Sequence, residues 1–194
     1  MKLYILRHED RTQDCSFFSP LSKEGLDNSK KLVKSLNECN IDLIFSSPFI
    51  RTLQTIDPYV SEKNLKVNID YGLSEIHSKD IIPKKSVGIE LPTYMAEIFN
   101  YNPTYTSIIK HNEISYPENY ECVVKRVKRI LKKIFIDYFD KDYNILLVTH
   151  QSLCCSILNI VNKHQKINEN IRNNYKKGQL TLVYDNCWLY NPIN

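Results

Sequence analysis

The stretch KLYILRHEDR, residues 2–11, decides how the rest of the chain is interpreted. Its first five residues form a short apolar run, which is typical of a strand buried inside a sheet. The run stops abruptly at Arg7-His8, where charged residues begin. A charged loop at the carboxyl end of a buried strand is therefore the first candidate functional position.

Polar residues also follow a second apolar run, over residues 41–45, which predicts another strand. Ser47 fits the N-cap of the next helix and Pro48 its first position, so Arg51 should lie in the first helical turn. Pro58 should end or bend that helix within about three turns of its start. Arg51 is thus expected close to the end of this strand.

A third buried strand is predicted over residues 144–149, ending at His150 and passing into an apolar helix over 152–161. In a parallel sheet covered by helices, ligands bind beyond the carboxyl ends of the strands. The polar residues after the three strands should therefore meet in one crevice: Arg7, His8, Arg51 and His150.

Alternating strand and helix patterns fill most of the remaining chain. A helix capped by Ser22 should run to about residue 37, and a strand over 65–69 should lead towards Glu75. Pro117 is a plausible first residue of the longest amphipathic helix, whose apolar face continues to Tyr138. These patterns predict an α/β protein, a three-layer α/β/α sandwich with a mostly parallel central sheet.

Two segments complete the predicted organisation. Runs over 180–184 and 187–190 suggest a short hairpin at a sheet edge. The pattern weakens over about 77–115, which we interpret as a variable insertion or lid that should supply substrate recognition. The length of 194 residues suits one domain over 1–194.

The composition excludes several classes of protein. An apolar fraction of 42% and a charged fraction of 25% are ordinary for a soluble globular chain. The net charge of +4 is too small to indicate nucleic-acid binding without a clustered basic face. One basic cluster exists, but it is predicted on the polar, solvated side of the longest helix: Lys125, Arg126, Lys128, Arg129, Lys132 and Lys133.

Neither a metal site nor a membrane segment is predicted. The six cysteines are scattered without the Cys or His spacing that suits zinc. No stretch reaches membrane-spanning length, and the apolar run at the N-terminus is too brief for a signal sequence. We therefore expect reduced thiols, a cytoplasmic location and no metal or cofactor.

The residue types at the strand ends point to phosphate chemistry. The guanidinium groups of Arg7, Arg11 and Arg51 can each form paired, charge-assisted hydrogen bonds with a phosphate. His8 and His150 are the candidate nucleophiles, because no serine or cysteine nearby has an obvious partner base. Taken singly, each residue is more often structural, so only their joint placement supports this interpretation.

A phosphoryl transfer also needs a group that protonates the leaving alkoxide and later accepts a proton from water. Glu75, just after a predicted strand, is the candidate general acid and base. A carboxylate at such a position is more often simply solvated.

The chain resembles the histidine phosphatase superfamily, which includes cofactor-dependent phosphoglycerate mutases, and the likeness spans nearly the whole chain. Four blocks carry it, in the family's order: Leu6-Arg7-His8; Leu21-Ser22-Lys23-Glu24-Gly25; Ser46-Ser47-Pro48 with Arg51 and Gln54-Thr55; and Val148-Thr149-His150. The resemblance implies a phosphoglycerate mutase-like fold and a phosphohistidine formed on His8. It also implies a phosphate pocket lined by Arg7, Arg51 and His150, with Glu75 as proton donor.

Two neighbours of His8 refine what the resemblance implies. Arg11 matches the Arg-His-x-x-Arg form of the phosphatase branch, which favours hydrolysis of a phosphorylated small molecule or phosphotyrosine over mutase activity. Glu9 stands where the family has glycine, and could either point away or weaken anion binding by repulsion. A phosphate-binding or scaffold module with little catalysis is therefore the alternative. Pathway and oligomeric state are not predicted.

Overall fold

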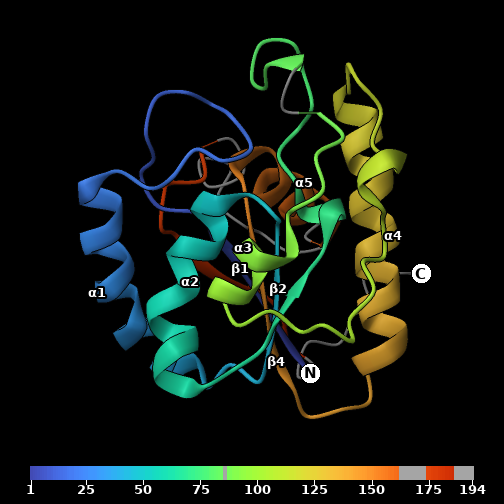
Figure 1. The fold of residues 1–194 in the computed structure, drawn as a ribbon. Helices are drawn as coiled ribbons and strands as arrows, with labels where there is room; N and C mark the ends of the chain where they lie inside the picture. The colour runs from blue at the N-terminus through green and yellow to red at the C-terminus, as the bar shows by residue number, and fades with distance from the viewer. Residues whose placement is uncertain (85–86, 162–173, 186–194) are drawn as a thin grey trace.

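In the computed structural model, which describes residues 1–84, 87–161 and 174–185, the core is a five-stranded sheet in the order β3-β2-β4-β1-β5 (Figure 1). Strands β1 to β4 are mutually parallel, and β5 runs antiparallel to β1. The strands are β1 (Lys2–Arg7), β2 (Leu43–Ser46), β3 (Val67–Ile69), β4 (Asn144–Thr149) and β5 (Leu180–Asp185).

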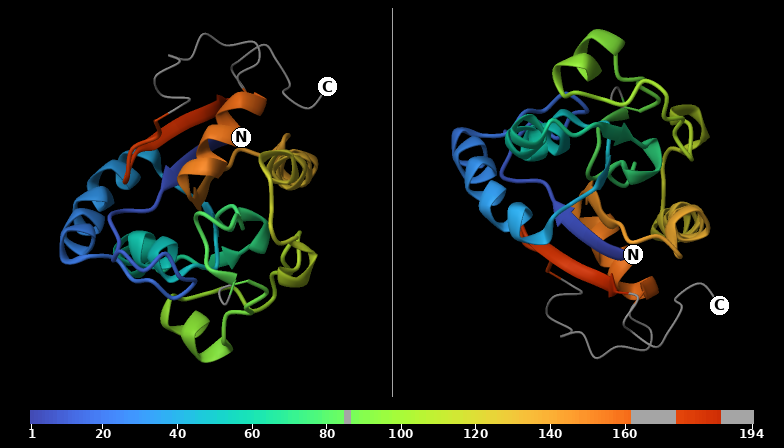
Figure 2. Two further views of the ribbon diagram at one scale, coloured as in Figure 1. Left: turned by 90° about the horizontal axis from the view of Figure 1, so that it is seen from above. Right: turned by 90° about the horizontal axis from the view of Figure 1, so that it is seen from below.

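Helices cover both faces of this sheet (Figure 2). One face packs against α1 (Lys23–Cys39) and α2 (Ile50–Lys63), and the other against α4 (Tyr120–Tyr138) and α5 (Gln151–Val161). The shorter helices are η1 (Tyr71–Leu73), α3 (Thr93–Ile98) and η3 (His111–Glu113). The three-layer α/β/α sandwich predicted from the sequence is confirmed.

Strand alternation explains why both faces need covering. Along β1, Leu3 and Ile5 lie in the core beneath α4 and α5, whereas Tyr4 and Leu6 lie in the core beneath α1 and α2. A strand with apolar residues on both sides is stable only between two helical layers. The continuous apolar run that opens the sequence therefore specifies a central strand.

The register brings the strand ends together. Arg7 in β1 pairs with Thr149 in β4, and Ser46 in β2 pairs with Val148. The residues that follow these three strands consequently leave the sheet at the same end, beyond the carboxyl ends of the strands, as the sequence predicts.

Helix α2 begins later than predicted. Its N-cap is Phe49 and its first residue Ile50, so Ser47 and Pro48 precede the helix, although Arg51 does lie in the first turn. The reason is a competing contact, because the Ser47 hydroxyl lies 2.9 Å from Nε2 of His150. Pro58 lies inside α2, which continues to Lys63 and is therefore not ended by the proline.

Helix α4 also begins later, because Asn119 is its N-cap and accepts a hydrogen bond from the amide of Cys122. The prediction of Pro117 as the first helical residue is thus wrong. By contrast, Ser22 caps α1 as predicted, accepting a hydrogen bond from the amide of Gly25.

The basic cluster on α4 is not entirely solvated. Arg126 is 5% exposed and lies within the protein, which corrects its predicted place on the polar face. The side chains of Lys125, Arg129 and Lys133 are exposed, and each forms an ion pair with an acidic residue. Three of the five other basic residues of the cluster are thus paired with an acidic residue.

At the other end of the sheet, β5 forms the predicted edge strand by pairing with β1. The second strand of the predicted hairpin, over 187–190, lies outside the described residues. No helix in the described part of the chain is long and apolar enough to cross a membrane.

Candidate active site

A polar cavity of about 400 Å³ opens at the carboxyl ends of the parallel strands. We call it the strand-end cavity. It is lined by Arg7, His8, Asp10, Arg11, Gln13, Arg51, Glu75, Ile81 and Lys177. Every predicted site residue except His150 lines it, and the side chains include four cationic groups.

His8 leaves the end of β1 with its ring buried and its orientation fixed. Its side chain is 3% exposed, and Nδ1 lies 2.7 Å from the carbonyl oxygen of Glu9. Burial, and next the charge of Arg51, hold the pKa of His8 well below its ordinary value. The ring is therefore neutral near pH 7. Because a carbonyl oxygen can only accept, the single ring proton is on Nδ1, and Nε2 carries a free lone pair.

Two of the arginines are anchored on backbone carbonyls. Arg7 donates through Nη1 to the carbonyl of Tyr175 at 2.5 Å, and Arg51 donates through Nη1 to the carbonyl of Ser16 at 2.9 Å. Burial lowers the pKa of Arg51 to about 10, which leaves it charged at neutral pH. The guanidinium of Arg51 also lies over the ring of Phe49, 4.5 Å from its centroid.

Both arginines retain unused donors. Among the described residues, the buried Nε of Arg7 and that of Arg51 have no hydrogen-bond partner. A buried N–H without a partner is costly. Beside these buried atoms, the cavity has the positive charge that suits an anion.

Arg11 lines the same cavity from the loop after β1. It donates through Nη1 to the carbonyl of Thr12 at 2.7 Å and through Nη2 to Sγ of Cys15 at 2.9 Å. The backbone of Arg11 forms an isolated bridge with Leu21, which fixes the loop beside α1.

His150 lies behind the cavity instead of lining it. The ring is fully buried and contacts the ring of His8 edge-on, with centroids 5.1 Å apart. Burial, reinforced by the charge of Arg51, keeps the pKa of His150 well below its ordinary value. Its Nε2 contacts Ser47, whereas Nδ1 lies 3.8 Å from Oε2 of Glu75. Since the ring is neutral, this last contact is not an ion pair.

Glu75 lies in the loop after η1 and is 8% exposed. One carboxylate oxygen, Oε1, accepts a hydrogen bond from the amide of Ile76 at 3.0 Å. Oε2 faces His150. The carboxylate is therefore held by its own backbone on the wall of the strand-end cavity.

The side chain of Glu9 packs away from this cavity. Its carboxylate lies against Gly178, where an added Cβ would come within 1.8 Å of Oε1 of Glu9. The Glu9 amide donates to Oγ1 of Thr55 at 3.0 Å. Positive φ angles among the described non-glycine residues occur at four other positions, so Glu9 needs no glycine-like backbone. Of the two possibilities weighed for Glu9, the structure shows the side chain pointing away.

Four lining residues could not be recognised from the sequence pattern: Asp10, Gln13, Ile81 and Lys177. Lys177 forms an ion pair with Asp10, which also accepts a hydrogen bond from Ser22 at 2.6 Å. Lys177 comes from the turn before β5, far along the chain, and no motif marks it. Ile81 is the one lining residue from the predicted lid, so most of the insertion lies elsewhere.

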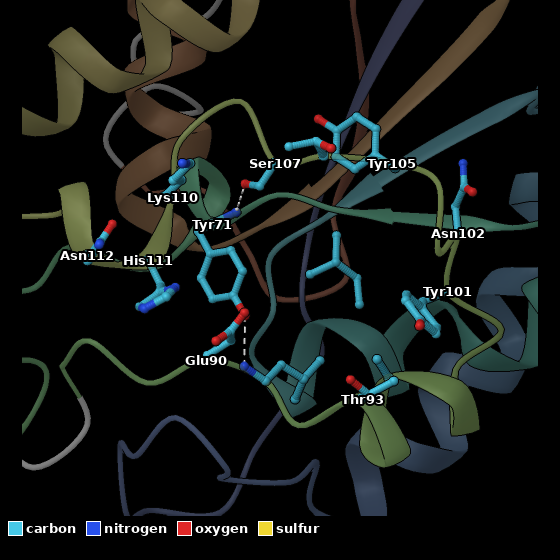
Figure 3. Close-up of a pocket in the computed structure, with 14 residues that line it drawn as sticks. Tyr71, Glu90, Thr93, Tyr101, Asn102, Tyr105, Ser107, Lys110, His111 and Asn112 are labelled. Atoms are coloured by element: carbon cyan, nitrogen blue, oxygen red, sulfur yellow. Dashed lines mark hydrogen bonds between the residues drawn. The ribbon is translucent and has the colours of Figure 1, made fainter.

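Part of that insertion builds a second hollow, of about 380 Å³ (Figure 3). Tyr71, Tyr101, Tyr105 and His111 line it, and Tyr71 accepts a hydrogen bond through its hydroxyl from the amide of Leu91. It has no lining residue in common with the strand-end cavity. The segment predicted to supply substrate recognition therefore mostly surrounds a separate pocket.

Within the described ranges, no group of three or more His, Cys, Asp or Glu side chains could hold a metal ion. The five cysteines found there, at positions 15, 39, 122, 154 and 155, are free.

These features define an α/β/α sandwich with a neutral histidine among arginines at the carboxyl ends of its strands, where proteins of this class bind ligands. Comparison with known proteins identifies the family within this class. The profile of the histidine phosphatase superfamily (branch 1) matches residues 6–183. This chain therefore belongs to the histidine phosphatase superfamily, branch 1.

Similar structures have the same fold at low sequence identity. The ecdysone phosphate phosphatase of Bombix mori, in complex with tungstate, aligns with a TM-score of 0.72 and 15% identity, over 98% of this chain and 92% of that one. The mycobacterial glucosyl-3-phosphoglycerate phosphatase gives 0.63 and 18%, over 93% and 90%. Phosphoserine phosphatase from Entamoeba histolytica gives 0.61 and 18%, over 93% and 89%.

One protein of similar sequence is named as a transcription factor subunit and not as a phosphatase. The transcription factor tau 55 kDa subunit of Saccharomyces cerevisiae is 28% identical over 163 residues, which cover 78% of this chain. The chain spans 37% of the length of that yeast protein.

Proposed function

We propose that the protein is a metal-independent phosphomonoesterase that transfers a phosphoryl group to Nε2 of His8. The observation that carries the proposal is the neutral His8 ring, with its proton held on Nδ1 by Glu9, in a cavity with Arg7, Arg11 and Arg51. A neutral imidazole needs no base to attack phosphorus.

In the first step, the Nε2 lone pair forms a bond to phosphorus while the bond to the ester oxygen breaks. The leaving oxygen takes a proton from the carboxyl group of Glu75. The ring becomes a positively charged phosphohistidine that keeps its Nδ1 proton, and the Glu9 carbonyl stabilises it by a charge-assisted hydrogen bond. The arginines neutralise the charge on the transferring phosphoryl oxygens.

In the second step, water attacks phosphorus and gives its proton to the Glu75 carboxylate. The bond between phosphorus and Nε2 breaks, and its electron pair returns to the His8 ring. Inorganic phosphate leaves, and both residues regain their starting protonation states. The substrate class is a phosphorylated small molecule or a phosphotyrosine side chain.

The proposal is tested by hydrolysis of p-nitrophenyl phosphate in EDTA. Wild-type protein should turn it over, and His8→Ala should abolish turnover. Quenching in alkali should leave a phosphate on the peptide that contains His8, detected by mass. His111→Ala is the matched control, since that histidine lies in the second hollow. Equal turnover by wild type and His8→Ala would contradict the proposal.

A second candidate is a phosphate-recognition module within a larger assembly, with little catalysis. The similarity to a transcription factor subunit favours it. Calorimetric binding of inorganic phosphate without turnover of any ester would support this candidate.

Mutase activity is a weaker third candidate. It would require phosphoryl transfer with 3-phosphoglycerate, and hydrolysis of other esters without such transfer would exclude it. The cytoplasmic location stays a prediction.

A further inference from the structure

We infer that Arg126 and Glu118 are positioning residues for the proposed general acid Glu75, an inference that rests on the proposed function. We call this buried pair the Arg126–Glu118 clamp. Arg126 is 5% exposed and comes from α4, and Glu118 is 5% exposed and just precedes that helix. Neither lines the strand-end cavity, so their proposed role is to hold the loop that carries Glu75 and not to contact substrate.

The guanidinium of Arg126 holds the backbone of this loop just before Glu75 and at Glu75 itself. Nη1 donates to the carbonyls of Gly72 at 2.6 Å and Ser74 at 2.8 Å, and Nη2 donates to the carbonyl of Glu75 at 3.3 Å. Ser74 and Glu75 belong to no helix or strand, so their carbonyls lack the partners that regular structure supplies. Arg126 supplies partners for both carbonyls from another layer of the fold.

Glu118 holds the loop on the other side. Its Oε2 accepts a hydrogen bond from the amide of His77 at 3.0 Å, and its own amide donates to the carbonyl of His77 at 2.8 Å. The two residues are joined by hydrogen bonds of 2.7 and 2.9 Å between the Arg126 guanidinium and the carboxylate. The five hydrogen bonds of Arg126 match the five N–H donors of a guanidinium.

The position of the Glu75 carboxylate follows from this backbone. Its Oε1 is bonded to the amide of the next residue, Ile76, so the carboxylate moves with the loop. Thr149 adds an anchor from β4, donating through Oγ1 to the carbonyl of Leu73 at 2.6 Å. A misplacement of about 1 Å can cost on the order of 100-fold in rate, so the clamp should matter for proton transfer.

The test compares two esters that differ in their need for an acid. The leaving group of p-nitrophenyl phosphate departs without a proton, whereas that of phenyl phosphate benefits from one. Arg126→Met should lower kcat/KM for phenyl phosphate on the order of 100-fold, which is the usual contribution of a general acid. The same variant should leave kcat/KM for p-nitrophenyl phosphate almost unchanged. Arg129→Met is the matched control, because that arginine is exposed on the same helix.

Glu75→Gln should show the same dependence on the leaving group. In the Glu75→Gln background, Arg126→Met should cause no further loss, because a positioning residue has nothing left to position. If Arg126→Met does not fold, Arg126→Lys serves instead, since it keeps the charge but cannot make five hydrogen bonds.

The outcomes separate the two proposals. A wild-type protein that hydrolyses neither ester overturns the proposed function and this inference with it. Wild-type turnover, with equal losses on both esters in the Arg126 variant, overturns the inference alone. An additive loss in the double variant would also overturn it, because it would show a role independent of Glu75.

Discussion

Gly178 has two independent reasons to be glycine. Its φ is +64°, and a Cβ would come within 1.8 Å of Oε1 of Glu9. Gly88 has φ +69° but open space around its Cα. Gly88→Ala should therefore cost about 1 kcal/mol of unfolding free energy from backbone strain alone. Gly178→Ala should cost about 1–3 kcal/mol more, measured by urea unfolding.

Removing the neighbouring side chain separates the two causes. In a Glu9→Gly background, the cost of Gly178→Ala should fall to that of Gly88→Ala. Equal costs for the two single variants would show that the Glu9 side chain swings aside freely.

His77 should make the fold sensitive to acid. The ring is buried beside Phe49, and its nitrogens have no partner among the described residues. Burial, and next the charge of Arg126, lower its pKa to about 4 from 6.5, against the opposing charge of Glu118. Because the unfolded chain takes up the proton first, stability is full above pH 6.5 and is lost as pH falls towards 4. This loss amounts to about 3 kcal/mol.

The variant His77→Leu should remove that share of the pH dependence. Unfolding free energies measured between pH 7 and pH 4 should then fall less steeply than in wild type. Stability at pH 7 should be unchanged or higher, since no hydrogen bond of the ring is lost. An unchanged slope would contradict the prediction.

At the scale of the elements, two glutamates bind α4 in contrasting surroundings. Glu118 pairs with Arg126 inside the protein, whereas Glu113 pairs with Arg129 at the surface. Glu118→Ala leaves a buried charge unpaired and should cost about 3–5 kcal/mol in urea unfolding. Glu113→Ala should produce no measurable change, because solvent screens an exposed pair. Similar costs for both variants would refute this difference.

Helix α4 also shows what the sequence could and could not indicate. Its apolar stripe correctly predicts the buried face, including Val123 and Ile130. Arg126 stands three residues after Val123 and four before Ile130, so its helical position marked it as buried. Charge alone suggested a solvated residue. The missing information was Glu118, whose contact depends on the path of the preceding loop.

For the whole molecule, anion binding should be visible as stability. Inorganic phosphate that binds only the folded chain should raise the unfolding free energy by about 2.7 kcal/mol at 100 times its Kd. The melting temperature should rise with phosphate but not with chloride at equal ionic strength. Arg51→Met should lose this rise, and Arg129→Met should keep it. A rise that survives in Arg51→Met would place the phosphate elsewhere.

The layered fold and the meeting of strand ends were predictable, because apolar runs and parallel topology fix both. Arg7, His8 and Arg51 meet in the strand-end cavity for that reason. The contacts of the strand-end cavity with residues 174–178 were not predictable. Tyr175 and Lys177 approach the cavity from a turn that no sequence motif marks. His150 also departs from expectation, because its ring packs against that of His8 and does not line the cavity.

The sheet order has a consequence for how the protein is made. Strand β1 leads directly into His8 but pairs only with β4 and β5, which are synthesised much later. During translation the first residues must wait, without strand partners, for at least the next 140 to emerge. The amide of Gly178, which bonds the carbonyl of Arg7, arrives later still. A growing chain therefore cannot complete this cavity, or bind phosphate there, until residue 178 has been synthesised.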